Sequence, residues 1–244
     1  MYSFDGRIRY SETDVAGRLT LKSLMDYFQD CSVFHSESVG GGWEVLGRDH
    51  AAWLLAAWQV RVHGRPSLGD AVTVSTWPVN VDGRVAAREF TMEAADGTLL
   101  AEADSMWLYY RFDEGRSARV PDSETERYAP ECGARLDLPR TRLSIRARGE
   151  GEPAAPTTVT EHLLDTNRHV NNAYYVELAR LAAGMGDDVS RVEASYRTPA
   201  VLGDVIRPVV HAEEGAAVVE LGDGADVLYA TVRLEAEGPD ARGA

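Results

Sequence analysis

The sequence has little cysteine, since Cys31 and Cys132 are the two residues of this type among 244. Small extracellular domains held by disulfides carry far more, so this usage is typical of a reducing compartment and predicts two free thiols. Cys31 falls on the apolar face of a predicted helix and Cys132 in a predicted linker. Neither is therefore expected to be a catalytic nucleophile.

Long apolar runs are missing as well. A membrane-spanning helix needs about 18 consecutive apolar residues, whereas the stretch over residues 51–60 is shorter and ends before Arg61. Residues 1–10 include Asp5, Arg7 and Arg9 and lack the apolar segment of a secretory signal. We therefore expect a protein without membrane insertion that stays in the cytoplasm.

Basic residues are scarce beside acidic ones. The 25 Lys and Arg residues face 39 Asp and Glu, which gives a formal net charge of -14. This negative field repels nucleic acid and anionic membranes, and no dominating basic cluster offsets it. Nucleic acid is therefore not an expected partner.

Several catalytic signatures are also absent. The sequence has no Gly-x-Ser-x-Gly elbow of a serine hydrolase and no pair of Cys or His at metal-binding spacing. Gly222-Asp223-Gly224 lacks the rest of a dinucleotide fingerprint and predicts a hairpin turn instead. A serine triad and a zinc site are therefore not expected.

One order of elements occurs twice in the chain. Each half begins with an extended segment, continues with an amphipathic helix and ends with four strands. The first copy has its extended segment at 2–10, its helix at 20–46 with a break at glycines 40–42, and strands at 51–63, 71–81, 86–95 and 99–112. The second has them at 156–164, at 172–183, and at 191–198, 205–212, 216–221 and 226–237.

A polar segment rich in proline separates the two copies. A chain of this length can bury one large core or two smaller ones, and the repeat favours two. We predict modules over residues 1–115 and 156–244, joined by a linker over residues 116–155.

The repeat extends to individual residues. Residues 14–20, before the first helix, align with residues 165–171, before the second. Thr20 is the predicted N-cap of the first helix. A long helix on an antiparallel sheet, reached through an Asp-x-x-x-His loop, predicts an α+β fold of tandem hot-dog modules, an intramolecular counterpart of a hot-dog dimer.

The loop before the second helix holds the best catalytic candidates, Asp165, Asn167 and His169. A histidine can act as a general base near neutral pH, and a neighbouring carboxylate can fix its tautomer. Asn167 could orient a water or a substrate carbonyl. The backbone N-H groups at the helix start are candidate donors to an oxyanion: those of Val170, Asn171 and Asn172.

A structural interpretation of the same loop stays open. Asp165 and Asn167 could shape the turn and cap the helix, with His169 packed beside them. The repeat argues for chemistry, because the first copy has Arg18 where the second has His169. His35, near the end of the first helix, is either a polar group of the helix terminus or a further site residue.

Several motifs in order resemble the acyl-acyl-carrier-protein thioesterases of plants and bacteria, a double hot-dog family. They are YSETD at 10–14, FQD at 28–30, AWL at 52–54, STWP at 75–78, SMW at 105–107 and DTNRHVNN at 165–172. The resemblance covers nearly the whole chain. It implies hydrolysis of the thioester between a fatty acyl chain and the phosphopantetheine of acyl carrier protein (ACP), without a metal or an organic cofactor. It further implies that Asp165, Asn167 and His169 are catalytic and that the first module holds the acyl chain.

The chain departs from that family at one position. The strand after the second helix normally supplies a further acid, but here that position is Pro199. Glu177 and Glu193 are candidate substitutes. Two alternatives stay open because of this gap: a hot-dog enoyl-thioester hydratase or dehydratase, and a non-catalytic binder of acyl thioesters or of ACP.

The partner implied by the resemblance is ACP, which is acidic like this chain. Docking would therefore need a local basic patch. The densest group of arginines lies in the predicted linker, where it could equally be a solvated surface: Arg140, Arg142, Arg146 and Arg148. Since one chain would supply both modules, we expect a monomer or a homodimer.

Overall fold

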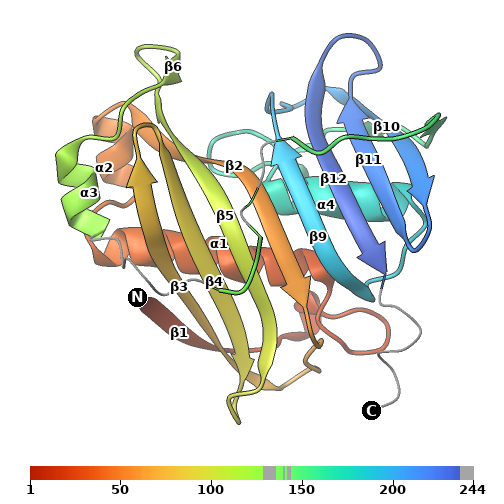
Figure 1. The fold of residues 1–244 in the computed structure, drawn as a ribbon, viewed down its shortest axis with the longest axis horizontal. Helices are drawn as coiled ribbons and strands as arrows, with labels where there is room; N and C mark the ends of the chain where they lie inside the picture. The colour runs from red at the N-terminus through yellow and green to blue at the C-terminus, as the bar shows by residue number, and fades with distance from the viewer. Residues whose placement is uncertain (129–135, 140, 142–143, 237–244) are drawn as a thin grey trace. The chain divides into compact units, whose positions relative to one another are not determined.

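The computed structural model describes residues 1–128, 136–139, 141 and 144–236. The chain divides into two compact units, Met1–Thr141 and Arg142–Ala244. In each unit a long helix lies against an antiparallel sheet (Figure 1). The predicted linker is partly structured, since it contributes a short strand and a helix to the first unit.

The first unit has the order of elements that its sequence predicts. Its sheet runs β1-β3-β4-β5-β2, with all neighbours antiparallel and β6 paired to β5. The helix prediction is confirmed, including the break at the glycines. The elements are β1 (Tyr2–Arg7), η1 (Tyr10–Glu12), α1 (Leu21–Ser38), α2 (Trp43–Arg48), β2 (Ala51–Val62), β3 (Ala71–Asp82), β4 (Val85–Ala94), β5 (Leu99–Arg111), β6 (Arg116–Ser117) and α3 (Asp122–Tyr128).

Helix α1 begins at a capped position and buries one face. The hydroxyl of Thr20 accepts the N-H of Ser23 at 3.1 Å, which satisfies one unpaired donor of the first turn. Phe28 is fully buried and packs on Phe90 of β4 and Trp58 of β2, with ring centroids 5.3 and 6.2 Å away. These rings form the centre of the core between helix and sheet.

The second unit repeats this plan at smaller scale. Its sheet runs β9-β12-β11-β10-β7, antiparallel throughout, with β8 paired to β10. The side chain of Asn171 caps α4 by accepting the N-H of Ala173 at 2.8 Å. The elements are β7 (Glu152–Pro153), β8 (Thr157–Thr158), η2 (Glu161–Leu163), α4 (Asn172–Ala182), β9 (Val189–Tyr196), β10 (Val205–Glu213), β11 (Ala216–Gly222) and β12 (Leu228–Ala236).

The buried face of α4 matches that of α1. Tyr175, Val176 and Ala179 are buried, as are the residues that the repeat aligns with them, Leu24, Met25 and Phe28. The α+β prediction of two helix-on-sheet layers is thus confirmed. Within the described residues, no helix has the length and apolar character needed to cross a membrane.

Candidate functional site

The candidate site is the loop over residues 164–171, which we call the second-unit loop; it joins η2 to α4. The Asp165 carboxylate accepts the N-H groups of Asn167 at 2.8 Å and His169 at 3.2 Å. The Asp165 N-H in turn donates to the His169 carbonyl at 2.8 Å. Arg168 lies at the tip of the loop and has a φ of 62°, a left-handed conformation that the tight turn requires. Asp165 therefore closes the loop from within.

The loop rests on the segment between β9 and β10. His169 forms an isolated bridge with Val201, and the Val170 N-H donates to the Ala200 carbonyl at 3.0 Å. The Ala200 N-H donates to the Tyr175 hydroxyl at 2.8 Å. Burial raises the pKa of Tyr175 to about 12, so this hydroxyl is protonated at neutral pH. Sequence reasoning placed Tyr175 on the helix face and missed this role.

The first unit contains the same loop over residues 13–20, the first-unit loop. The Asp14 carboxylate accepts the N-H groups of Ala16 at 2.8 Å and Arg18 at 3.0 Å, as Asp165 does in the second copy. Gly17, with a φ of 73°, stands where Arg168 does. Both carboxylates therefore hold a turn, and what distinguishes the two loops is the side chains that the turn presents.

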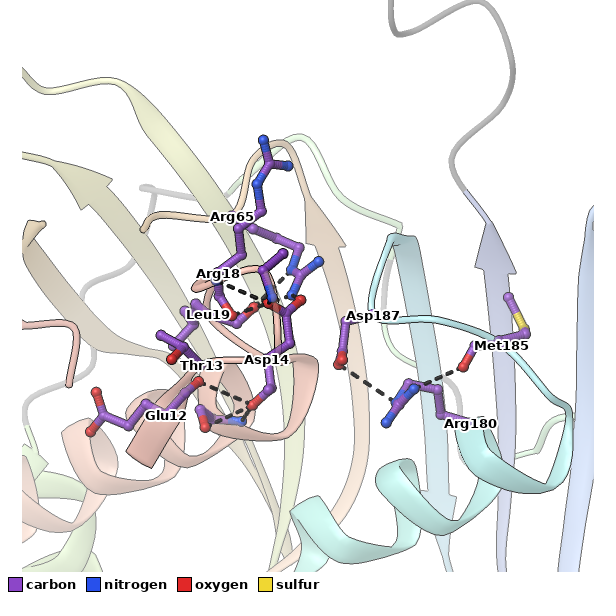
Figure 2. A network of polar contacts seen from close by, with 12 residues as sticks. Glu12, Thr13, Asp14, Arg18, Leu19, Arg65, Arg180, Met185 and Asp187 are labelled. Carbon is purple, nitrogen blue, oxygen red and sulfur yellow. Dashed lines mark hydrogen bonds and ion pairs between the residues drawn. The ribbon is translucent and has the colours of Figure 1, made fainter. Parts of the chain in front are cut away.

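A second difference lies beside the loops. In the first unit the Leu19 N-H donates to the Pro66 carbonyl, as that of Val170 does to Ala200, so Arg65 corresponds to Pro199. The Arg65 guanidinium bonds the Asp14 carboxylate and donates to the Leu19 carbonyl at 2.7 Å (Figure 2). Asp165 forms no ion pair with any described residue. Extending the repeat alignment past the helices would have found this pair.

The two carboxylates therefore differ in charge environment. Burial acts to raise the pKa of Asp14, but hydrogen bonds from Arg65 and from the N-H groups of Arg18 and Ala16 outweigh it. The pKa of Asp14 thus lies below its usual range. In the first unit, the negative charge of Asp14 is therefore neutralised by Arg65.

The second-unit loop brings the three predicted catalytic residues together. The side-chain amide of Asn167 lies 3.5 Å from the Asp165 carboxylate, and its residue is exposed. The imidazole of His169 is half-buried and has no hydrogen bond to any residue that the structure describes. The expected contact between the Asp165 carboxylate and the imidazole is absent, because that carboxylate is bound to the loop backbone.

Two of the three backbone N-H groups predicted to bind an oxyanion already donate to carbonyl groups of the protein. The N-H of Val170 donates to Ala200 and that of Asn171 donates to the Leu163 carbonyl at 2.9 Å, so neither is available to a substrate. For the N-H of Asn172, the first residue of α4, no acceptor is found among the described residues.

The candidate substitutes for the missing acid have cationic partners. Glu177 binds Arg180 through both carboxylate oxygens, at 2.7 and 2.9 Å. Arg180 also donates to the Met185 carbonyl and pairs with Asp187 (Figure 2). Glu193 pairs with Arg191 at 2.6 Å. Neither glutamate is thus an unpaired base.

The other predicted residues belong to other segments of the chain. His35 belongs to the first unit, where it accepts a hydrogen bond from Arg88. Of the predicted docking arginines, Arg146 and Arg148 are exposed, and Arg140 and Arg142 lie outside the described residues.

Known proteins are similar to this chain in sequence and in fold. A family model described as Acyl-ACP thioesterase N-terminal domain matches residues 2–128. The acyl-[acyl-carrier-protein] hydrolase FATB3 of Cuphea viscosissima is 23% identical over 179 residues, which cover 69% of this chain and 43% of that protein. The chain spans about half the length of the curated relatives it matches.

Solved structures of low identity show the fold. An acyl-ACP thioesterase from Bacteroides thetaiotaomicron has a TM-score of 0.82 at 21% identity, covering 96% of each chain. The 12:0-ACP thioesterase from Umbellularia californica has a TM-score of 0.80 at 19% identity, covering 96% of this chain and 92% of its own. The predicted hot-dog fold is thus confirmed. Since the family model matches more than half of the sequence, the chain belongs to the acyl-ACP thioesterase family.

Proposed function

We propose that this chain hydrolyses the thioester of fatty acyl-ACP, with His169 as the general base. One observation carries the assignment within the molecule. The two loops have the same backbone hydrogen bonds, yet the second bears Asn167 and His169 where the first has Ala16 and Arg18. A turn kept for structure alone has no need of an amide and an imidazole at these places. Membership of the family supports the reaction class.

In the proposed mechanism the His169 imidazole takes a proton from water while the water oxygen attacks the thioester carbonyl. The tetrahedral intermediate then expels the phosphopantetheine sulfur, which receives the proton, and the free fatty acid is left. The imidazole suits this step because it is half-buried and without a hydrogen-bond partner among the described residues. Asn167, exposed beside it, positions the water or the carbonyl.

The other two contributions come from the loop itself. Asp165 acts as a positioning residue, since its carboxylate fixes the backbone that carries Asn167 and His169. The Asn172 N-H, at the positive end of α4, is the donor available to the developing oxyanion. No residue at position 199 takes part, because proline has no titratable group.

The test is release of free fatty acid from medium- and long-chain acyl-ACP by the purified protein and three variants. His169→Ala should lose about 10²- to 10⁴-fold in kcat. Arg18→Ala, at the same place in the first-unit loop, should keep full activity. Pro199→Ala should stay within about twofold of the wild type, because the residue is exposed and contributes no acid.

The products separate the remaining alternatives. An altered double bond without free acid would mean a hydratase or dehydratase, and binding without any product would mean a non-catalytic binder. Full activity of His169→Ala would remove the general base from this loop.

A further inference from the structure

A small cavity lies inside the first unit, between the end of α1, strands β2 to β5 and α3. It is partly open to the surface and has a volume of about 40 Å³. Most of its wall is aromatic and apolar and includes Trp53, Pro78, Trp107 and Tyr128. The wall also contains the polar Ser36 and one charged residue, Arg88. The proposed mechanism makes no use of this charge.

Arg88 is buried with 8% of its surface exposed, and it has no carboxylate partner among the described residues. Its Nη1 donates to Nδ1 of His35 at 2.9 Å and to the hydroxyl of Thr76 at 3.1 Å. The guanidinium lies over the ring of Tyr128, 5.5 Å from its centroid. Burial lowers the pKa of Arg88 to about 10, so the group remains cationic at neutral pH.

The buried acids near this cavity are engaged elsewhere. Glu124 pairs with Arg127 at 2.9 Å and accepts the indole N-H of Trp53 at 3.2 Å. Glu89 accepts the indole N-H of Trp77 at 3.0 Å. A buried cation without a counter-charge is costly, and the cost falls when an anion binds beside it.

The remaining donors of Arg88 suit a carboxylate. Within the described part of the chain, its Nε and Nη2 have no hydrogen bond, and these two form the fork that binds both oxygens of one carboxylate. The size agrees, because a water needs about 10–15 Å³ on this measure, so 40 Å³ admits roughly three such atoms, the size of a carboxyl group.

We infer that this cavity binds the terminal carboxylate of an acyl group, so that the preferred thioesters are those of dicarboxylic acids. This rests on the proposed function. Arg88 supplies the charge that the carboxylate needs. An unsubstituted alkyl end gains only the apolar contacts and leaves the guanidinium without an anion.

Two measurements test the assignment. In the first, hydrolysis of suberyl-ACP is compared with that of octanoyl-ACP, which has the same number of carbons. The wild type should favour suberyl-ACP roughly 10- to 100-fold in kcat/KM. Arg88→Met should lose this preference and Arg88→Lys should keep part of it. Arg84→Met, an exposed arginine beside the same strand, should behave as the wild type.

The second measurement is independent of catalysis: titration calorimetry with free suberate and with its dimethyl ester, which has no carboxylate, on the wild type, His169→Ala and Arg88→Met. Suberate should bind more tightly in an Arg88-dependent manner, also in His169→Ala. If neither thioester is hydrolysed but this binding difference is present, the proposed function fails and the carboxylate site stands. Equal binding of suberate and its dimethyl ester by the wild type, or a preference unchanged in folded Arg88→Met, overturns the site.

Discussion

The guanidinium of Arg65 bonds the carboxylate of Asp14 in the first unit, whereas the residue that corresponds to Arg65 in the second unit is Pro199. One copy of the loop therefore holds its acid in an ion pair, and the other leaves it with backbone partners and Asn167. The difference accompanies the change from Arg18 to His169. This difference supports the proposal that the second copy and not the first carries the chemistry.

Replacing Arg65 by Met should weaken the acid sensitivity of the first unit. The pKa of Asp14 is depressed in the folded protein, so its contribution to stability is present above the unfolded value of about 3.9 and is lost as pH falls through the folded pKa. Without Arg65 the folded pKa rises towards the ordinary value and less stability remains to be lost. Urea unfolding at pH 7 and pH 3 measures this, with Asp14→Asn as the control. An equal acid-induced loss in wild type and Arg65→Met would contradict it.

Activity and stability should tolerate loss of the Asp165 charge better than loss of its hydrogen-bond acceptor. Asp165→Asn keeps an oxygen that accepts the N-H groups of Asn167 and His169, so kcat should stay within about tenfold of the wild type. Asp165→Ala removes the acceptor and should lower both kcat and stability, the latter by about 1.5–3 kcal/mol. Turnover and thermal unfolding distinguish the two. If Asp165→Asn were as inactive as His169→Ala, the carboxylate charge would act on the imidazole directly.

Much of the fold follows from local patterns in the sequence. The helical spacing after Thr20, the glycines after α1 and the Asp96-Gly97 turn each fix their element through neighbouring residues alone. The turn of the second-unit loop is equally local, because the hydrogen bonds that the Asp165 carboxylate accepts come from residues within four positions of it. Sequence patterns report such short-range constraints well.

The contacts that set the charge environment of Asp14 and Arg88 do not show in local patterns, because they join positions that are distant in the sequence. Arg65 and Asp14 are separated by 51 residues, and Arg88 and His35 by 53. Nothing in the spacing of a strand shows that Arg88 faces inwards without an acid. The segment after β6 was also misjudged, since its prolines suggested an irregular linker whereas residues Asp122–Tyr128 form α3.

Removing the hydroxyl of Tyr175 should loosen the support of the second-unit loop. In Tyr175→Phe the N-H of Ala200, a fully buried residue, loses its acceptor, which should cost about 1–3 kcal/mol of stability. The kcat should fall, though less than in His169→Ala, because Val170 remains bonded to the Ala200 carbonyl. Thermal unfolding and turnover measure both effects, beside Tyr10→Phe at a position that is 84% exposed. Wild-type stability of Tyr175→Phe would show that water replaces the hydroxyl.

We expect Arg146 and Arg148 to contribute to binding of the carrier protein and not to binding of the acyl group. Both are exposed in a chain with a net charge of -14, so they offer local positive charge to an acidic carrier against a repulsive field. Replacing both by Ser should raise KM for acyl-ACP roughly three- to tenfold and leave KM for the matching acyl-CoA unchanged. Arg84→Ser, also exposed, serves as the control. The effect should shrink as salt screens the charges. Equal changes for both substrates would mean that these arginines belong to a solvated surface and that ACP docks elsewhere.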